Sequence, residues 1–336
     1  MGVRSVVCCN DSPATTHERE GSMRISLALG ILVVLLIAPG RPTADAQGVF
    51  GGWIYVPDTS NNRIVRMGDL AGARWTATTL AAGGPRALYL PEGVAVDRAG
   101  RLYIADSGHF RLVRVDGPDG RGWVALGRSG TETGQFAFPS GIALDRAGRI
   151  YVADYGNNRI VRLDAMTGRG WTEFRGPRRA DQFAFPAGIA LDGQGRIYVA
   201  DSHNHRIVRI DDMSGAGWTT LGRFGSDAGE FNFPAAVAVD GSGRIYVADT
   251  RNHRVVRVDN MRGDGWMALG HLGSGVGEFR FPGGVFVDGG GRLYIVDSRN
   301  NRLVRVDSMN GTGWTARGTR GGGAGQFRNP RDVFIM

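Results

Sequence analysis

Short apolar runs recur along most of the chain at a nearly constant interval. Residues 185–232 show one unit, which reads FPAGIALD, GQGR, IYVADS, HNH, RIVRID, a longer loop and WTTLGRFG. The first two apolar runs are almost uninterrupted, as in strands buried on both faces, whereas the third includes arginine. Turns rich in Gly, Asn and Asp separate the runs and favour antiparallel hairpins. Each unit therefore predicts a four-stranded antiparallel meander, with strands a, b, c and d in chain order.

One proline and one tryptophan mark each unit. The prolines that open strand a are Pro91, Pro139, Pro186, Pro234, Pro282 and Pro330, at intervals of 47 or 48 residues. The tryptophans that precede strand d are Trp75, Trp123, Trp171, Trp218, Trp266 and Trp314. Roughly 40–50 residues per four strands is the period of a β-propeller blade. Five complete units and one split unit predict an all-β fold, a six-bladed β-propeller of four-stranded antiparallel blades.

The two ends of the repeat region complement each other. Residues 52–84 supply strands b, c and d without a strand a, whereas 329–336 (NPRDVFIM) match strand a of the other units. We therefore predict a first blade made of residues 52–84 plus 329–336, closed by the C-terminal strand. The other predicted blades are residues 90–137, 138–184, 185–232, 233–280 and 281–328.

The N-terminal part of the chain lies outside the repeat and contains one longer apolar run. Residues 25–37 form a 13-residue apolar run after Arg24, and an A-D-A sequence stands at 44–46. A run this short is typical of a signal peptide and falls below the length of a membrane span. We predict a signal peptide at 23–46 and a secreted or periplasmic propeller at 47–336, with no stable membrane span after cleavage. A signal segment retained as an anchor is the alternative.

Residues 1–22 do not fit a signal peptide, and we interpret them as a doubtful leader from a mis-assigned start, with Met23 as the true start. The only two cysteines, Cys8 and Cys9, lie in this leader. The predicted mature domain therefore has no disulfide and no cysteine metal site.

The charge balance is basic, with a formal net charge of +8, and all 40 basic residues are arginine. The arginines recur at fixed positions of the repeat and form no single block. This distribution favours a GC-rich genome over an anionic partner as the cause of the arginine content. The predicted signal peptide leads away from cytoplasmic RNA, so no nucleic-acid partner is expected. We expect a monomer that binds a protein, a peptide or a glycan.

The segments YVADYGNNRIVRLD, YVADSHNHRIVRID and YVADTRNHRVVRVD resemble the NHL repeat. That signature joins an aspartate at the end of strand b to an Asn-His or Asn-Arg turn and an apolar strand c. The resemblance covers residues 52–336 and implies a bacterial, secreted NHL-type propeller. NHL propellers include peptide-amidating lyases, RNA- or protein-binding domains and extracellular sensor domains, so the resemblance leaves the function open.

The enzymes that this resemblance implies would need a metal at the channel mouth. The amidating lyases carry zinc-binding histidines just after the strand-a proline, and no histidine stands there in this chain. The six residues are Glu92, Ser140, Ala187, Ala235, Gly283 and Arg331. Six-bladed lactonases hold a divalent metal with Glu, Asn and Asp, and only Glu92 and Asp332 are acids near the predicted mouth. A lyase or lactonase-like hydrolase with one calcium or zinc ion therefore remains an alternative to a protein with no cofactor.

In a four-stranded meander the b–c turns and the d–a links share one face of the ring, which is the predicted binding face. The ligand-binding candidates on it are Glu92, Tyr155, His203, His205, His253, Arg331 and Asp332. Of these, His203, His205, Glu92 and Asp332 are weak candidates for a metal site. No catalytic residue is assigned. The predicted function is a binding or scaffold module, and the alternative is a metal-dependent lyase or hydrolase.

Overall fold

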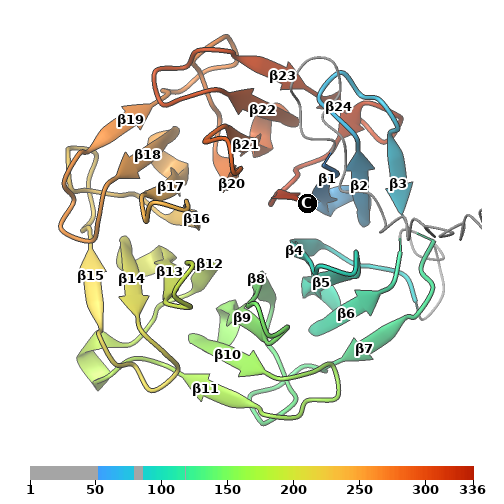
Figure 1. Ribbon diagram of the computed structural model, residues 1–336, viewed down its shortest axis with the longest axis vertical. Coiled ribbons are helices and arrows are strands. Elements are labelled where there is room, and N and C mark those ends of the chain that lie inside the picture. Colours follow the sequence, from blue (N-terminus) through green and yellow to red (C-terminus); the bar gives the residue numbers. More distant parts are fainter. Residues whose placement is uncertain (1–51, 79–85, 118) are drawn as a thin grey trace, which may run out of the picture. The chain divides into compact units, whose positions relative to one another are not determined.

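The computed structural model describes residues 52–78, 86–117 and 119–336, all within one compact unit that spans residues 42–336. The predictions for the leader, the signal peptide and residues 47–51 lie outside the described residues. Six four-stranded antiparallel sheets surround a central axis (Figure 1). In each sheet, strand a lies nearest the axis and strand d at the outer rim. The predicted six-bladed β-propeller is confirmed.

Five sheets have the predicted a–b–c–d order in sequence. Blades 2 and 3 contain β4 (Pro91–Val96), β5 (Leu102–Asp106), β6 (Arg111–Val115), β7 (Val124–Leu126), β8 (Pro139–Leu144), β9 (Ile150–Asp154), β10 (Arg159–Leu163) and β11 (Thr172–Phe174). Blades 4 and 5 contain β12 (Pro186–Leu191), β13 (Ile197–Asp201), β14 (Arg206–Ile210), β15 (Thr219–Leu221), β16 (Pro234–Val239), β17 (Ile245–Asp249), β18 (Arg254–Val258) and β19 (Met267–Leu269). Blade 6 contains β20 (Pro282–Val287), β21 (Leu293–Asp297), β22 (Arg302–Val306) and β23 (Thr315–Arg317).

Blade 1 is closed by the end of the chain. It contains β26 (Phe334–Ile335), β1 (Ile54–Asp58), β2 (Arg63–Met67) and β3 (Thr76–Thr78). Ile335 and Phe334 pair with Ile54 and Tyr55, so the predicted closure by the C-terminal strand is confirmed. This strand a has two residues where the other blades have six, and β24 (Thr319–Arg320) and β25 (Gln326–Phe327) form a parallel pair in the link that leads to it.

A 3₁₀ turn follows strand b in every blade. These turns are Thr59–Asn61, Ser107–His109, Tyr155–Asn157, Ser202–Asn204, Thr250–Asn252 and Ser298–Asn300, and one further 3₁₀ turn, Arg179–Asp181, lies in the link before blade 4. The residue after each b–c turn has a left-handed backbone with φ of 54–57°. Asparagine and histidine tolerate this conformation better than most residues, which explains their place in the repeat.

The core lies between the blades. Each apolar cluster joins buried residues from two neighbouring sheets, because a twisted sheet buries its faces only against the next one. At the seam, Ile54 and Val65 of blade 1 pack in one cluster with Val296 and Leu303 of blade 6. The closing seam is thus packed like the other interfaces.

Strands a approach one another closely around the axis. An ideal Cβ on Gly141 would lie 2.6 Å from the carbonyl oxygen of Ala187, and one on Gly188 would lie 2.7 Å from the Cα of Ala236. Both obstacles are backbone atoms, which cannot rotate away. Glycine at these positions therefore sets the width of the channel.

Gly141→Ala is expected to lower the free energy of unfolding by about 1–3 kcal/mol, because the added methyl forces two strands apart. Urea denaturation measures this change. Gly241→Ala is the matched control, since an ideal Cβ there meets no atom within 4 Å. Equal stability of the two variants would contradict the close packing of strands a.

Candidate functional site

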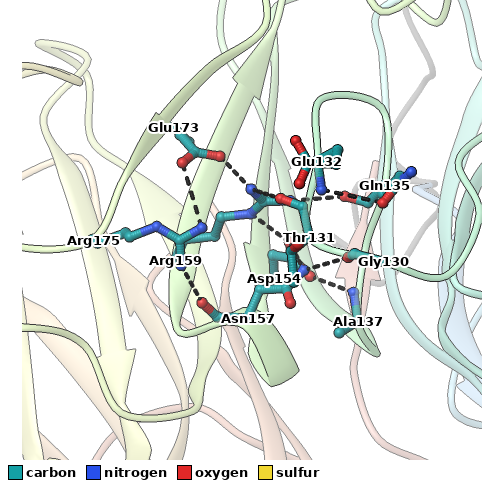
Figure 2. Close-up of polar contacts among 10 residues, drawn as sticks. All are labelled: Gly130, Thr131, Glu132, Gln135, Ala137, Asp154, Asn157, Arg159, Glu173 and Arg175. Carbon is teal, nitrogen blue, oxygen red and sulfur yellow. Dashed lines mark hydrogen bonds and ion pairs between the residues drawn. The ribbon is translucent and has the colours of Figure 1, made fainter.

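A buried aspartate and an arginine fasten the b–c turn of each blade. In blade 3, Asp154 is fully buried, and its Oδ2 accepts a hydrogen bond from Arg159 Nε at 2.7 Å (Figure 2). Its Oδ1 accepts one from the Ala137 backbone N–H at 2.8 Å. The Arg159 guanidinium donates onward to the carbonyl oxygens of Thr131 and Gln135 at 2.7 and 2.8 Å. One ion pair thus holds the turn and the preceding d–a link together, and we call this arrangement the clamp.

The clamp recurs in every blade. The pairs are Asp58–Arg63, Asp106–Arg111, Asp154–Arg159, Asp201–Arg206, Asp249–Arg254 and Asp297–Arg302, at 2.7–2.8 Å. In blades 2 to 6 the guanidinium also lies 5.3–5.7 Å from the ring of the blade's tryptophan. Because the same ion pair stands in all six blades and holds the same segments together, these arginines and aspartates have a structural role.

A second contact links neighbouring blades. The left-handed residue after the b–c turn accepts a hydrogen bond from the backbone N–H that precedes the next blade's proline. Asn158 Oδ1 receives it from Phe185 at 2.7 Å, whereas His205 and His253 use Nδ1 and receive it from Phe233 and Phe281 at 3.1 Å. The two histidines therefore make a contact that asparagine makes elsewhere in the ring.

Blade 2 departs from this pattern. Its left-handed residue is Phe110, which packs edge-on against Phe138 with ring centroids 4.8 Å apart. An aromatic contact replaces the hydrogen bond between blades 2 and 3.

The mouth of the axial channel opens between the b–c turns. A cavity of about 460 Å³ lies there, lined by first and second residues of the turns and by residues after the strand-a prolines. In blades 2 to 6 the pairing of strands a and b shifts register just after the proline, which is a β-bulge. A bulge re-aims side chains, so residues such as Glu92 line the mouth.

The structure brings four of the seven predicted site residues together at this mouth. Glu92, Tyr155, Arg331 and Asp332 line the cavity. His203 lies at its edge, where its Nε2 is 3.4 Å from the Tyr155 hydroxyl. His205 and His253 do not line the cavity, because they face the next blade.

Two charged residues of the mouth lining were not predicted from the sequence, Arg251 and Arg299. They occupy the second position of the b–c turn, the position that His203 holds in blade 4. Because His203 was a predicted site residue, the equivalent position in the other b–c turns could have identified both arginines from the sequence. The Arg251 guanidinium lies 3.8 Å from the centre of the Phe233 ring, which places a cation on an aromatic face at the rim.

The charged groups around the mouth influence one another. Burial raises the pKa of the Tyr155 hydroxyl, and the negative charge of Glu92 raises it further, whereas Arg331 and Arg251 oppose this rise. These residues come from blades 1, 2, 3 and 5. All four line the mouth cavity.

Asp332 lies deeper than the other charged residues. It borders both the mouth cavity and a smaller cavity of about 230 Å³ further down the channel. Its carboxylate accepts backbone hydrogen bonds from Val94 at 3.2 Å and Val333 at 2.8 Å. Enclosure among strand backbones raises its pKa to about 7, with a further contribution from Glu92. The corresponding residues of the other blades are Gly93, Gly141, Gly188, Ala236 and Gly284.

The donor set at the mouth fits a metal poorly. Among the described residues, no three His, Cys, Asp or Glu side chains gather where they would hold an ion. Glu92 and Asp332 supply carboxylates, but His203 and His205 both pack against the Phe233 ring, at 4.7 and 4.6 Å. His205 Nδ1 is also engaged with the Phe233 backbone.

A larger cavity of about 540 Å³ lies where blades 6 and 1 meet at the a–b turn end. Blade 1 has no a–b turn there, because its strands a and b come from opposite ends of the repeat. Of the charged side chains that line it, Asp288 and Arg292 pair with each other at 2.7 Å. We therefore place the candidate site at the opposite, b–c turn end of the channel.

The fold and the repeat define a class of protein. The NHL repeat model matches residues 88–115, 136–163, 183–210 and 231–258, which are the a, b and c strands of blades 2 to 5. The chain is a six-bladed β-propeller protein of the NHL-repeat family. No curated protein matches the chain significantly.

Solved structures share the architecture at low identity. A nidogen/laminin complex matches with a TM-score of 0.66 and 19% identity over 85% of this chain and 98% of the other. A protein of unknown function from Bacteroides caccae gives 0.62 and 18% over 85% and 99%. A streptogramin B lyase gives 0.57 and 15% over 84% and 83%. At these identities the likeness concerns the fold alone.

No helix in the described part of the chain has the length and apolar character needed to cross a membrane.

Asp201→Asn is expected to lower the free energy of unfolding by about 3–5 kcal/mol, because it leaves Arg206 without its buried partner. Chemical denaturation measures the loss. Asp212→Asn is the control, since this exposed aspartate bonds only within its own turn. A loss below about 1 kcal/mol at Asp201 would show that the clamp contributes little.

Asp332→Asn tests the raised pKa of the Asp332 carboxyl group. Because the folded-state pKa of about 7 lies above the ordinary value of 3.8, the neutral form stabilises the fold, and this stability is lost as pH rises from about 4 through 7. Asparagine stays neutral, so the variant should gain about 1–3 kcal/mol over the parent at pH 8 and little at pH 4. Denaturation at both pH values measures the gain. A difference independent of pH would contradict the raised pKa.

Proposed function

We propose that this protein is a binding module that holds a partner protein or peptide against the face formed by its b–c turns and d–a links. The sequence features of residues 23–46 support a site of action outside the cytoplasm, secreted or periplasmic. A glycan is the other partner class that this kind of face accommodates.

The distribution of exposed apolar side chains carries the proposal. Among the described residues, eight large apolar side chains are exposed, and six of them lie next to the strand-a prolines or in the d–a links. These six are Tyr89, Phe138, Phe224, Leu272, Val276 and Phe281. A soluble protein rarely gathers exposed apolar side chains on one face without a binding role.

The residues around these side chains favour a protein or peptide over a glycan as the partner. Phe224 and Phe233 contact the His205 ring at 4.9 and 4.6 Å, and Arg251 covers Phe233. Aromatic residues and arginine are the side chains enriched at the centres of protein interfaces. Rings held by neighbouring side chains also lose little conformational freedom on binding.

Peptides selected from a random library on the purified protein test this proposal. Their binding should fall at least about tenfold in Phe281→Ser and Leu272→Ser, because each serine removes an apolar contact. Met267→Ser is the matched control, since Met267 is 39% exposed but lies on an outer strand. Failure to enrich any peptide, or equal binding by all three variants, would contradict the proposal. Enrichment on a glycan array alone would favour the glycan.

A metal-dependent lyase or hydrolase with its site at the same mouth is the alternative, and the adjoining acids Glu92 and Asp332 are the observation that supports it. Calorimetric titration with calcium and zinc separates the two functions. We expect no stoichiometric ion, because two carboxyl groups beside three arginines bind a cation poorly. One ion per chain, lost in Glu92→Gln, would favour the enzyme.

A further inference from the structure

Four exposed arginines occupy neighbouring segments of the b–c turn face, outside the repeated arginine positions of the clamp and strand c. Arg280 and Arg328 stand two residues before a strand-a proline, Arg320 lies in β24, and Arg299 is the second residue of a b–c turn. Their side chains make no hydrogen bond or ion pair with any described residue. We call these four residues the arginine arc.

Hydrogen bonds bring the segments of the arginine arc side by side. The Arg299 backbone N–H donates to the Arg280 carbonyl oxygen at 3.0 Å, which joins the b–c turn of blade 6 to the link before it. After the turn, Asn301 Oδ1 accepts a hydrogen bond at 2.9 Å from the backbone N–H of Asn329, in the link that leads to blade 1. The arginine arc therefore occupies one turn and the two links that flank it.

The carboxylates of these segments do not neutralise the arginine arc. Glu278 accepts hydrogen bonds from two backbone N–H groups of its own link, at 2.7 and 2.8 Å. Asp297 and Asp58 are fully buried and belong to the clamp. Residues 318–329, the link that leads to blade 1, include no acidic residue. Positive charge is thus in excess here, and it favours an anionic partner.

The fold does not require arginine at these positions. In the other links, the residues equivalent to Arg280 and Arg328 are Tyr89, Ala137, Ala184 and Asn232. In the links that form the same short parallel pairing, the residues equivalent to Arg320 are Ser129, Phe224 and Leu272. The contacts that recur at these positions involve the backbone, so a neutral side chain is compatible with the ring.

Exposed apolar side chains border the arginine arc. Leu272 and Val276, in the link that carries Arg280, are 59% and 77% exposed. A sulfated polysaccharide or a nucleic acid presents charge along its outer surface and would leave these aliphatic groups in water. A peptide segment presents acidic and apolar side chains next to each other. The neighbouring apolar pair therefore favours an acidic peptide over another polyanion.

We infer that the arginine arc binds an acidic segment of the partner protein or peptide, with an apolar residue of the same segment against Leu272 and Val276. This inference rests on the proposed function and specifies the chemistry of the partner. A guanidinium group donates two parallel hydrogen bonds to one carboxylate, so the four arginines suit several acidic side chains in succession. The site lies on the links and the turn, and it needs no chain end of the partner.

The test uses the full protein and the peptide acetyl-Glu-Glu-Leu-Leu-Glu-Glu-amide, titrated by calorimetry. Acidic residues flank the apolar pair on both sides, so the peptide fits in either chain direction. It should bind at least about tenfold more tightly than acetyl-Gln-Gln-Leu-Leu-Gln-Gln-amide, because several ion pairs are lost with glutamine. Acetyl-Glu-Glu-Gly-Gly-Glu-Glu-amide should also bind more weakly, since it leaves the apolar pair uncovered. Equal affinity of the Glu and Gln peptides, or no binding of the Glu peptide, would overturn the inference.

Variants assign the effect to the arginine arc. The double variant Arg280→Gln/Arg328→Gln should weaken the Glu-Leu peptide about tenfold and leave the Gln peptide unchanged. Arg178→Gln/Arg179→Gln is the matched control, because these two arginines are exposed on the link before blade 4 and make no ion pair with a described residue. Equal losses in both double variants would overturn the inference, since they would reflect net charge alone.

The apolar contact has its own variant. Val276→Ser should weaken the Glu-Leu peptide and leave the Glu-Gly peptide unchanged, because only the first has an apolar side chain to lose. An equal effect on both peptides would contradict the apolar contact.

Two further arms separate this inference from other anionic partners and from the proposed function. Dextran sulfate or polyuridylate that displaces the peptide at an equal or lower concentration of charged groups would assign the arginine arc to polyanions and overturn the acidic peptide. Library peptides that need Phe281 and Leu272, contain no acidic residue and bind Arg280→Gln/Arg328→Gln as tightly as the parent would also overturn it. That second result would leave the proposed binding function intact.

Discussion

The buried ion pair between the last residue of strand b and the first residue of strand c is the interaction on which the ring depends. A carboxylate at zero exposure requires a partner charge and several hydrogen bonds. The arginine that supplies them also binds carbonyl groups of the link from the preceding blade, as Arg159 does with Thr131 and Gln135 (Figure 2). The same pair joins the b–c turn to the preceding d–a link in every blade.

The residues of the turns and links fall into two groups. Those of one group hold segments of the ring together, whereas those of the other are not constrained by the fold. The clamp, the left-handed turn residue and the strand-a proline recur around the ring because each makes a contact between segments. The second turn residue contacts the d–a link only through its backbone N–H, and neither its side chain nor that of the residue after the proline makes a contact that recurs around the ring. Several of these side chains line the mouth. These positions hold Arg251, Arg299, Arg331 and Glu92, so the charges that distinguish this propeller stand where the fold makes few demands.

The sequence predicted the ring well because its signals are local and repeated. The prolines and tryptophans gave the number of blades, and the match of 329–336 to strand a gave the closure. The mouth was harder to predict. A pattern does not tell which residue of a 3₁₀ turn faces the axis, so Arg251 and Arg299 were missed. The hydrogen bonds of His205 and His253 cross to the next blade, which no local signal describes. The enclosure of Asp332 likewise depends on a neighbouring strand.

We expect that folding needs the clamp but does not need the mouth residues. A single variant tests this directly by giving the mouth the small residues of other blades: Glu92→Ala, Arg251→Gly, Arg299→Gly, Arg331→Ala and Asp332→Gly. The measurement is its thermal midpoint at pH 7. We expect a midpoint equal to or above that of the parent protein. A midpoint well below it, comparable to the loss of one clamp, would contradict the separation of fold and site.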